Sequence, residues 1–381
     1  MRNKIIPSGL RDLLPDQVKV MREIEKKITQ LFKGYSFQEI ITPTFEYLDV
    51  IETGAGNIRE ELFLFMDREG GILSLRPEVT VAIARMVATH LIDKDFPQRL
   101  FYIANVFRHI QPQRAQHREF WQMGVELMGV SGVRADAEII TLAVESLRTI
   151  GVQDFKISLN QIGIFNSLLE DSSIESEQKK LIRSLVEGKD LVELGKLLES
   201  LPIDDALKET IVKLPVLHGG LEILRDLPYL EKHPQASQAV EELVNVYDAL
   251  QVTGVRENVV LDLGVLRGLD YYTGIVFEGY APDLGYGLLG GGRYDNLVGK
   301  FGRDCPAVGF AMGLDRLAMV LDSKEKSLPH YLVGGTDYEK VVERCNELRN
   351  KNYVVEMDVE NLTKAELEQK LKAPYQLIYI D

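Results

Sequence analysis

The sequence predicts an α+β protein in which helices flank an antiparallel sheet, with a small α/β appendage at the C-terminal end. Short segments of alternating apolar and polar residues end in turn sequences, as 61–66 and 72–75 do on either side of DREGG, and a period of two is typical of half-buried strands. Apolar residues at helical spacing separate such segments, most clearly in 16–32 and 135–150. Beyond residue 328, strands and helices alternate one for one, which is typical of a parallel sheet.

Composition and charge narrow the class of protein. The chain has 381 residues, 45% hydrophobic and 27% charged, which suits a soluble globular protein of two or three domains. With a formal net charge of −14, the chain lacks the positive field that attracts phosphate backbones. This argues against a tRNA partner. No segment approaches the ~20 apolar residues of a membrane span, and the first residues, MRNKIIPSGLRDLLPDQ, contain no apolar run of the length expected for a signal sequence. We therefore expect a cytoplasmic protein with no membrane attachment.

Cysteine and histidine usage gives no sign of a disulfide framework or of a metal centre. Cys305 and Cys345 stand far apart with no CxxC, and the six histidines form neither HxxxH nor HExxH. We expect free thiols, no metal and no cofactor.

The first elements of the core follow local signals. A helix over 16–32 is ended by Gly34. The stretch FQEIITPTFEYLDVI reads as a strand, a break at Pro43 and a second extended piece. The two strands around DREGG come next, and a helix starts directly after Pro77.

The rest of the core, which we expect to end at residue 322, repeats this pattern. Two strands, 100–109 and 118–129, flank a polar turn, and the helix over 135–150 is ended by Gly151. Residues 165–255 show helical periodicity throughout, which predicts a helical layer inserted between parts of the sheet. The remaining elements are a strand before that layer, then three strands and a closing helix after it: FKISLN, 258–263, 271–280, 285–290 and FAMGLDRLAMVL.

The appendage is separated from this core by LDSKEKSLPH, a charged stretch containing proline that is typical of a linker. Residues 328–381 then alternate strand, helix, strand, helix and strand, which predicts a separate small α/β domain with a parallel sheet.

The strand from Arg118 to Glu126 is the most informative segment for function. Alternation places Gln122 and Glu126 on one face with Gly124 between them, while Trp121 and its apolar neighbours point to the other face. Two polar side chains beside a glycine leave an unfilled space that suits a small polar ligand. The alternative is the solvated outer face of a sheet.

Two other segments add candidate ligand-binding groups. RPEVT places Glu78 and Thr80 at a strand-to-helix junction, where they would hold an ammonium group or simply cap the helix. RGLDYYTGIVFE supplies Arg267, followed by Tyr271 and Tyr272 on opposite faces of a strand, one suited to the core and the other to a pocket. LGGGRYDNL lacks the GxGxxG pattern, so its glycines are expected to serve close packing of strands.

These segments, in this order, resemble the histidyl-tRNA synthetase family over nearly the whole chain. The similar stretches are GLRDLLP, ITPTFEYLDV, LRPEVT, FRHIQPQRAQHREFWQMGVE, RGLDYYTGIVFE, GGGRYD and PAVGFAMGLDRL. RGLDYYTG is specific to the histidine branch of the class II synthetases. The resemblance implies the class II aminoacyl-tRNA synthetase-like antiparallel sheet, in agreement with the elements above, and a two-fold dimer formed around Pro43.

The resemblance also implies a histidine pocket. Glu78, Thr80 and Gln122 would contact the α-amino group, while Glu126 and Tyr272 would lie near the imidazole. Carboxylates and a tyrosine hydroxyl suit an ammonium and an imidazole N–H, and an arginine suits a carboxylate. The full implied set, with Arg267 near the ligand's carboxylate, is Glu78, Thr80, Arg108, Gln122, Glu126, Arg267, Tyr271 and Tyr272.

The chain departs from the synthetase pattern where adenylation and tRNA recognition occur. Ile110 stands where the family has an acidic residue that engages adenine, and an aliphatic side chain cannot accept a hydrogen bond from an amine. The basic, glycine-containing turn of the family has become Gln111, Ala115 and Gln116. Two arginines, Arg108 and Arg316, still match the nucleotide-site arginines. The appendage is about half the size of an anticodon-binding domain.

In these features the chain resembles a family of synthetase paralogues, the regulatory subunits of ATP phosphoribosyltransferase. It keeps the residues of a histidine pocket, has lost residues needed for adenylation, and has a shortened appendage. The resemblance implies a subunit with no catalytic residue that forms a hetero-oligomer with a short-form catalytic subunit at the first step of histidine biosynthesis. It also implies feedback inhibition by histidine. The alternative is a working histidyl-tRNA synthetase with a shortened C-terminal domain.

Overall fold

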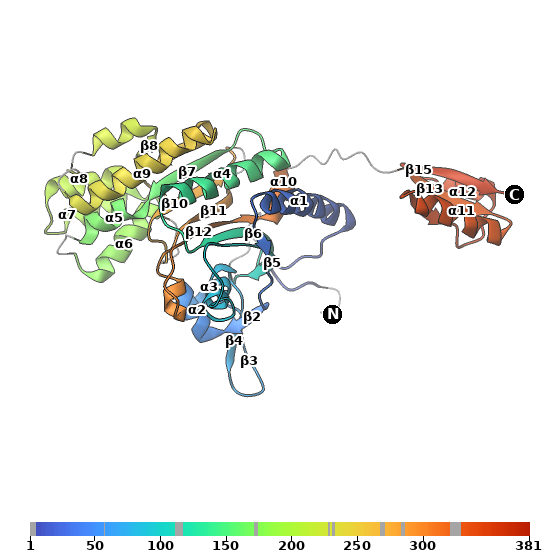
Figure 1. Cartoon of the computed structure of the whole chain (residues 1–381), viewed down its shortest axis with the longest axis horizontal. Helices are drawn as coiled ribbons and strands as arrows, with labels where there is room; N and C mark the ends of the chain where they lie inside the picture. The colour runs from blue at the N-terminus through green and yellow to red at the C-terminus, as the bar shows by residue number, and fades with distance from the viewer. Residues whose placement is uncertain are drawn as a thin grey trace. The chain divides into compact units, whose positions relative to one another are not determined.

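The structure, a computed structural model, describes residues 5–56, 58–110, 117–170, 174–227, 229–230, 233–266, 271–282, 286–320 and 329–381. The chain divides into two compact units, Met1–Leu321 and Asp322–Asp381, which are described separately (Figure 1). None of the helices in the described part of the chain combines the length and the apolar character that a bilayer span requires.

A mixed sheet forms the centre of the first unit. Its order within the described residues is β1-β5-β6-β12-β11-β10-β7-β9-β8. Neighbouring strands run antiparallel except in the pairs β1–β5 and β7–β9, which are parallel. The predicted antiparallel sheet is thus confirmed from β5 across to β7, and parallel pairs were missed on both sides. The strands are β1 (Gln38–Glu39), β5 (Gln98–Phe107), β6 (Glu119–Met128), β7 (Lys156–Gln161), β8 (His218–Gly219), β9 (Val259–Asp262), β10 (Ile275–Tyr280), β11 (Gly287–Arg293) and β12 (Ala307–Gly313).

Helices cover both faces of this sheet. Helices α1 (Pro15–Gly34) and α4 (Val133–Ile150) pack on the face to which β6 presents Met123 and Val125. Helix α3 (Thr80–Thr89) lies on the opposite face, in a second apolar cluster with Tyr102 of β5. The alternation predicted for β6 is therefore confirmed, and its polar face is enclosed rather than solvated.

Two predicted elements are wrong. Residues 310–313 of FAMGLDRLAMVL belong to β12, and only α10 (Leu314–Val320) is helical. Because β12 lies in the middle of the sheet with apolar contacts on both faces, its sequence is a continuous apolar run that periodicity cannot separate from a buried helix. The second extended piece after Pro43 is also shorter than expected, since LDVIETGA forms α2 (Leu48–Ala55).

A helical layer occupies the chain between β7 and β9 and is seen beside the sheet in Figure 1. The long α9 packs against α4 and α5, which attaches the layer to the core. Its α-helices are α5 (Ile162–Glu170), α6 (Ser176–Glu187), α7 (Leu191–Glu199), α8 (Asp205–Lys213) and α9 (Pro234–Val252).

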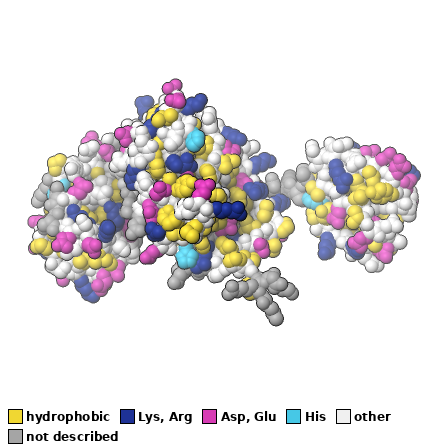
Figure 2. Space-filling view, turned by 90° about the horizontal axis from the view of Figure 1, so that it is seen from below, with side chains coloured by type: hydrophobic (Ala, Val, Ile, Leu, Met, Phe, Trp, Pro, Cys, Tyr) yellow, Lys and Arg dark blue, Asp and Glu magenta, His cyan; other side chains and the backbone are white. Residues whose placement is uncertain are grey.

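A small antiparallel sheet, β2-β4-β3, projects from the first unit. Its strands are β2 (Phe45–Tyr47), β3 (Leu64–Met66) and β4 (Ile72–Leu75), and β3 and β4 form the predicted hairpin. Several of its apolar side chains are exposed. Figure 2 views the molecule from the side on which this hairpin projects and shows hydrophobic side chains gathered there among charged ones.

The second unit is the predicted α/β appendage. All strand pairs are parallel in its sheet, whose order is β14-β13-β15. Val333, Cys345 and Leu348 form its core. Its elements are β13 (His330–Gly335), α11 (Tyr338–Asn350), β14 (Val354–Met357), α12 (Lys364–Lys370) and β15 (Tyr375–Ile380).

Candidate functional site

A small chamber of about 60 Å³ lies on the polar face of β6, enclosed by β11, β12 and the start of α3. Seven of the residues predicted for a histidine pocket line it together. The eighth, Arg267, lies outside the described residues. The lining side chains and backbone are those of Glu78, Thr80, Tyr102, Arg108, Gln122, Glu126, Tyr271, Tyr272, Gly290, Tyr294, Gly309, Phe310 and Ala311.

Glycines let neighbouring side chains and strands pack closely around the chamber, so the unfilled space predicted beside Gly124 is in fact occupied by Tyr102. A Cβ on Gly124 would stand 2.6 Å from the Tyr102 hydroxyl, and one on Gly309 would stand 2.0 Å from Glu126 Oε2 and 2.3 Å from the Val125 carbonyl oxygen. Gly291 approaches the carbonyl oxygen of Gly309 so closely that a Cβ would lie 2.1 Å away. The expectation that the GGG run serves close strand packing is thus confirmed, and this packing forms one wall of the chamber.

Glu126 is the more enclosed of the two carboxyls of the chamber, with 2% of its surface exposed. The Thr80 hydroxyl donates a 2.8 Å hydrogen bond to its Oε1, and the Tyr294 hydroxyl donates to its Oε2. Burial raises the pKa of Glu126 to about 8, and the neighbouring Glu78 adds to the rise while the two hydroxyls oppose it. The chamber therefore favours the protonated form of this carboxyl.

Glu78 caps α3 and also lines the chamber. Its carboxylate accepts the backbone N–H groups of Thr80 at 3.0 Å and Val81 at 2.8 Å, which caps α3. It is also buried at the chamber wall, where the Tyr271 hydroxyl lies 3.5 Å from Oε2. Burial raises its pKa, and the backbone donors and the charge of Arg108 oppose this rise.

Both tyrosines of RGLDYYTG line the chamber, and Tyr271 is in addition a buried member of the apolar cluster around α3, as expected for one core and one pocket residue. They precede β10, which starts only at Ile275, and strand alternation does not apply to them. Their rings contact each other in a tilted arrangement with centroids 5.0 Å apart, and Tyr271 also contacts Tyr294 edge-on at 5.6 Å.

Tyr294 and Tyr102 are chamber residues that the sequence reasoning missed. Tyr294 immediately follows β11 in the GGGRYD segment, where only the glycines were interpreted. A signal was present, because a tyrosine next to a strand that packs without side chains is well placed to reach across to the neighbouring strand.

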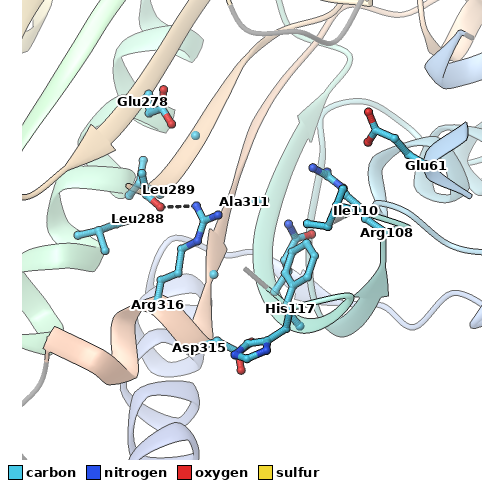
Figure 3. Close-up of a pocket in the computed structure, with 15 residues that line it drawn as sticks. Glu61, Arg108, Ile110, His117, Glu278, Leu288, Leu289, Ala311, Asp315 and Arg316 are labelled. Carbon is cyan, nitrogen blue, oxygen red and sulfur yellow. Dashed lines mark hydrogen bonds between the residues drawn. The ribbon is translucent and has the colours of Figure 1, made fainter. Parts of the chain in front are cut away.

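A larger cavity of about 310 Å³ adjoins the chamber (Figure 3). Arg108 and Gln122 line both spaces. Arg316 lies on the far wall of the larger cavity and donates a 2.6 Å hydrogen bond to the carbonyl oxygen of Gly287. Ile110 lies on the same wall as Arg108, and the predicted neutral turn residues Gln111, Ala115 and Gln116 lie outside the described part of the chain.

Arg108 is well placed to act on both spaces. Its Nε donates a 3.0 Å hydrogen bond to the carbonyl oxygen of Pro77, and its guanidinium lies 5.8 Å from the ring centre of Phe120. Arg76, in contrast, is structural: its guanidinium donates to the carbonyl oxygens of Asn105 and Thr42, both at 2.8 Å. No cluster of three metal-ligating side chains occurs among the described residues.

Comparisons with known proteins agree on one group of relatives. A family model described as histidyl-tRNA synthetase matches residues 9–317. The ATP phosphoribosyltransferase regulatory subunit of Moorella thermoacetica is 40% identical over 371 residues, which cover 97% of this chain and 95% of that protein. The regulatory subunit of the same name from Desulfitobacterium hafniense is 40% identical over 362 residues, 94% of this chain and 93% of that one.

Two solved structures also resemble this chain over nearly its whole length. A structure described as ATP phosphoribosyltransferase regulatory subunit/histidyl-tRNA synthetase from Bacillus halodurans superimposes with a TM-score of 0.87 at 32% identity, covering 98% of this chain and 97% of that one. The histidyl-tRNA synthetase of a Nostoc species gives 0.79 at 26% identity, with 97% and 89% covered.

Proposed function

Because this chain belongs to the family of ATP phosphoribosyltransferase regulatory subunits, within the histidyl-tRNA synthetase-like proteins, we propose that it is a cytoplasmic, non-catalytic subunit that binds histidine and conveys feedback inhibition to a short-form catalytic subunit. The observation that carries this proposal is the contrast between the two adjoining cavities. The inner one brings together seven of the eight residues predicted for a histidine pocket, whereas the outer one has Ile110 on its wall.

The inner chamber suits histidine group by group. Glu78, Thr80 and Gln122 offer oxygens to an ammonium, and Glu126 offers a carboxyl to a ring nitrogen. Arg108, and by resemblance Arg267, would meet the ligand's carboxylate. Buried polar groups whose hydrogen bonds are satisfied only by a bound ligand favour that ligand over close analogues that leave them unpaired.

The domain organisation of the chain fits the same proposal. Residues 1–322 would form the synthetase-like core with 165–255 as an inserted helical layer, and 328–381 a shortened anticodon-binding-like domain. The helical layer argues against tRNA, since residues 162–255 contain 17 Asp and Glu against 9 Lys and Arg.

Co-purification with the short-form catalytic subunit tests the proposal as a whole. The complex is expected to show phosphoribosyltransferase activity that the catalytic subunit alone lacks, and histidine is expected to inhibit it. Failure of the two proteins to associate, or activation that histidine leaves unchanged at saturating concentrations, would contradict the assignment.

The isolated protein is expected to show no histidine-dependent exchange between pyrophosphate and ATP. Ile110 cannot accept a hydrogen bond from the adenine amine, so the nucleotide would not be oriented. Ile110→Glu alone should not restore exchange, because the turn is also neutral. Exchange at about 1–10³ per second, the range of working enzymes, would instead support the alternative function, a histidyl-tRNA synthetase, for which the retained Arg108 and Arg316 speak.

Self-association as a two-fold dimer is expected to use the segment around Pro43 and the small sheet β2-β4-β3. Ile41 is 84% exposed and Met66 75% exposed, and Phe45, Tyr47, Leu64, Phe65 and Ile72 are also exposed. Apolar side chains gathered in this way mark interaction surfaces. Ile41→Glu with Phe45→Glu should reduce the dimer to monomer in light scattering, whereas Val192→Glu, at an exposed apolar site of α7, should not. A monomeric wild type at micromolar concentration would refute this expectation.

A further inference from the structure

Two buried carboxyls of the inner chamber are held by one residue, Thr80. Its backbone N–H donates to Glu78 at 3.0 Å, and its hydroxyl donates to Glu126 at 2.8 Å. Both carboxyls are more than nine-tenths buried. Among the described residues that line the chamber, Arg108 is the only cation. Two negative charges so close together in a small enclosed space repel each other, so the pair is expected to hold one proton.

The surroundings decide which carboxyl carries that proton. Glu78 accepts two backbone N–H groups and feels the charge of Arg108, and both effects favour its ionised form. Apart from Glu78, the groups that contact Glu126 are neutral. Burial of Glu126 outweighs the hydrogen bonds that it accepts, so its pKa rises to about 8. The side chains that face it are Glu78 and Thr80 from the start of α3, Tyr102 from β5, Tyr271 and Tyr272 before β10, and Tyr294 after β11.

We propose that the chamber binds its ligand with a single proton shared between Glu126 and a weakly basic ring, and so selects side chains that titrate near neutral pH. A permanent cation would bring a second proton that the chamber must expel, and a non-basic ring of the same shape would leave the shared proton without an acceptor. This inference rests on the proposed histidine-binding function and specifies the chemistry of that site.

Proton counting gives the pH dependence. Between the imidazole pKa of about 6.5 and the Glu126 pKa of about 8, the protein carries the proton, the ring is neutral, and binding exchanges none with the buffer. Above that window Glu126 is ionised, so binding takes up one proton. Below it both partners are protonated, so binding releases one. Histidine affinity should fall about tenfold per pH unit outside either limit.

Calorimetry on the full chain tests this, with histidine titrated at about pH 5.5, 7.2 and 8.5, each in two buffers of different ionisation enthalpy. Wild type should release one proton at the lowest pH, exchange none at the middle one and take up protons at the highest. Glu126→Gln has no carboxyl to ionise, so it should bind more weakly at neutral pH and take up no proton at the highest pH, whereas release at the lowest pH, which comes from the imidazolium of the ligand, should remain. Titration of the ligand's own α-ammonium is common to both proteins and cancels in the comparison.

Two further measurements complete the design. Glu241→Gln, which changes an exposed carboxyl on α9, is the matched control and should reproduce the wild-type profile. Triazolylalanine, a less basic ring of nearly the same shape, should bind wild type at least about tenfold more weakly than histidine. If no proton is exchanged at any of the three pH values, or if the two ligands bind with equal affinity, the shared proton is refuted while the proposed function still stands. Wild type that binds no histidine at any pH would overturn the proposed function as well.

Discussion

Replacement of Glu126 by alanine is expected to weaken histidine binding about tenfold or more, while the fold and the subunit assembly persist. The change removes the acceptor of the Thr80 and Tyr294 hydroxyls together with the group proposed to face the imidazole. Each buried donor left without a partner costs about 1–3 kcal/mol. Calorimetry on the purified variant measures the affinity. In the complex, the variant should still activate the catalytic subunit yet need much more histidine for inhibition.

The control for this variant is Glu241→Ala, which removes an exposed carboxyl on α9 and should leave histidine affinity unchanged. Equal affinity in wild type and Glu126→Ala would show that the chamber is not where histidine binds. If histidine affinity falls as expected but inhibition of the complex is unaltered, feedback must act through another site.

Replacement of Arg293 by methionine is expected to lower the free energy of unfolding of the first unit by about 3–5 kcal/mol, the cost of breaking a buried ion pair. The Nε of Arg293 donates to Asp136 at 2.9 Å, and Nη2 lies 2.7 Å from the same oxygen. Nη1 donates to Asp295 at 2.9 Å and to the carbonyl oxygen of Val130 at 3.2 Å. The pair joins the end of β11 to the first turn of α4, so its loss leaves a buried carboxylate without a counter-charge.

Urea unfolding followed by tryptophan fluorescence measures this loss, because the only tryptophan of the chain, Trp121, belongs to β6 of the first unit. Burial raises the pKa of Asp136, and removal of Arg293 would raise it further. When the pKa of a carboxyl is higher in the folded than in the unfolded protein, the free energy of unfolding falls as the pH rises above the unfolded-state pKa. The destabilisation should therefore grow from mildly acid to neutral pH. The double change Arg293→Met with Asp136→Asn should recover part of it, and no recovery would refute the ion-pair explanation.

Local patterns predicted the parts of the site that lie within one element. Alternation along β6 placed Gln122 and Glu126 on one face, and the junction after Pro77 placed Glu78 and Thr80 at a helix start. The contact between Tyr294 and Glu126 was not predictable in this way, because it depends on which strands pair and in what register. Gly309 of β12 pairs with Glu126, and residues 310–313 of the same strand had been assigned to a helix. Sequence periodicity carries no information about such partners.

The glycine wall has a kinetic consequence. Since Gly290 and Gly309 line the chamber with backbone atoms, that wall cannot collapse inward by a change of rotamer. A ligand that enters therefore does not have to reopen the site or order loose side chains on that side, and preorganisation of this kind reduces the entropic cost of binding. Binding of the proposed histidine ligand would then change mainly charge and hydrogen bonding at this wall, which would favour fast exchange as the histidine concentration changes.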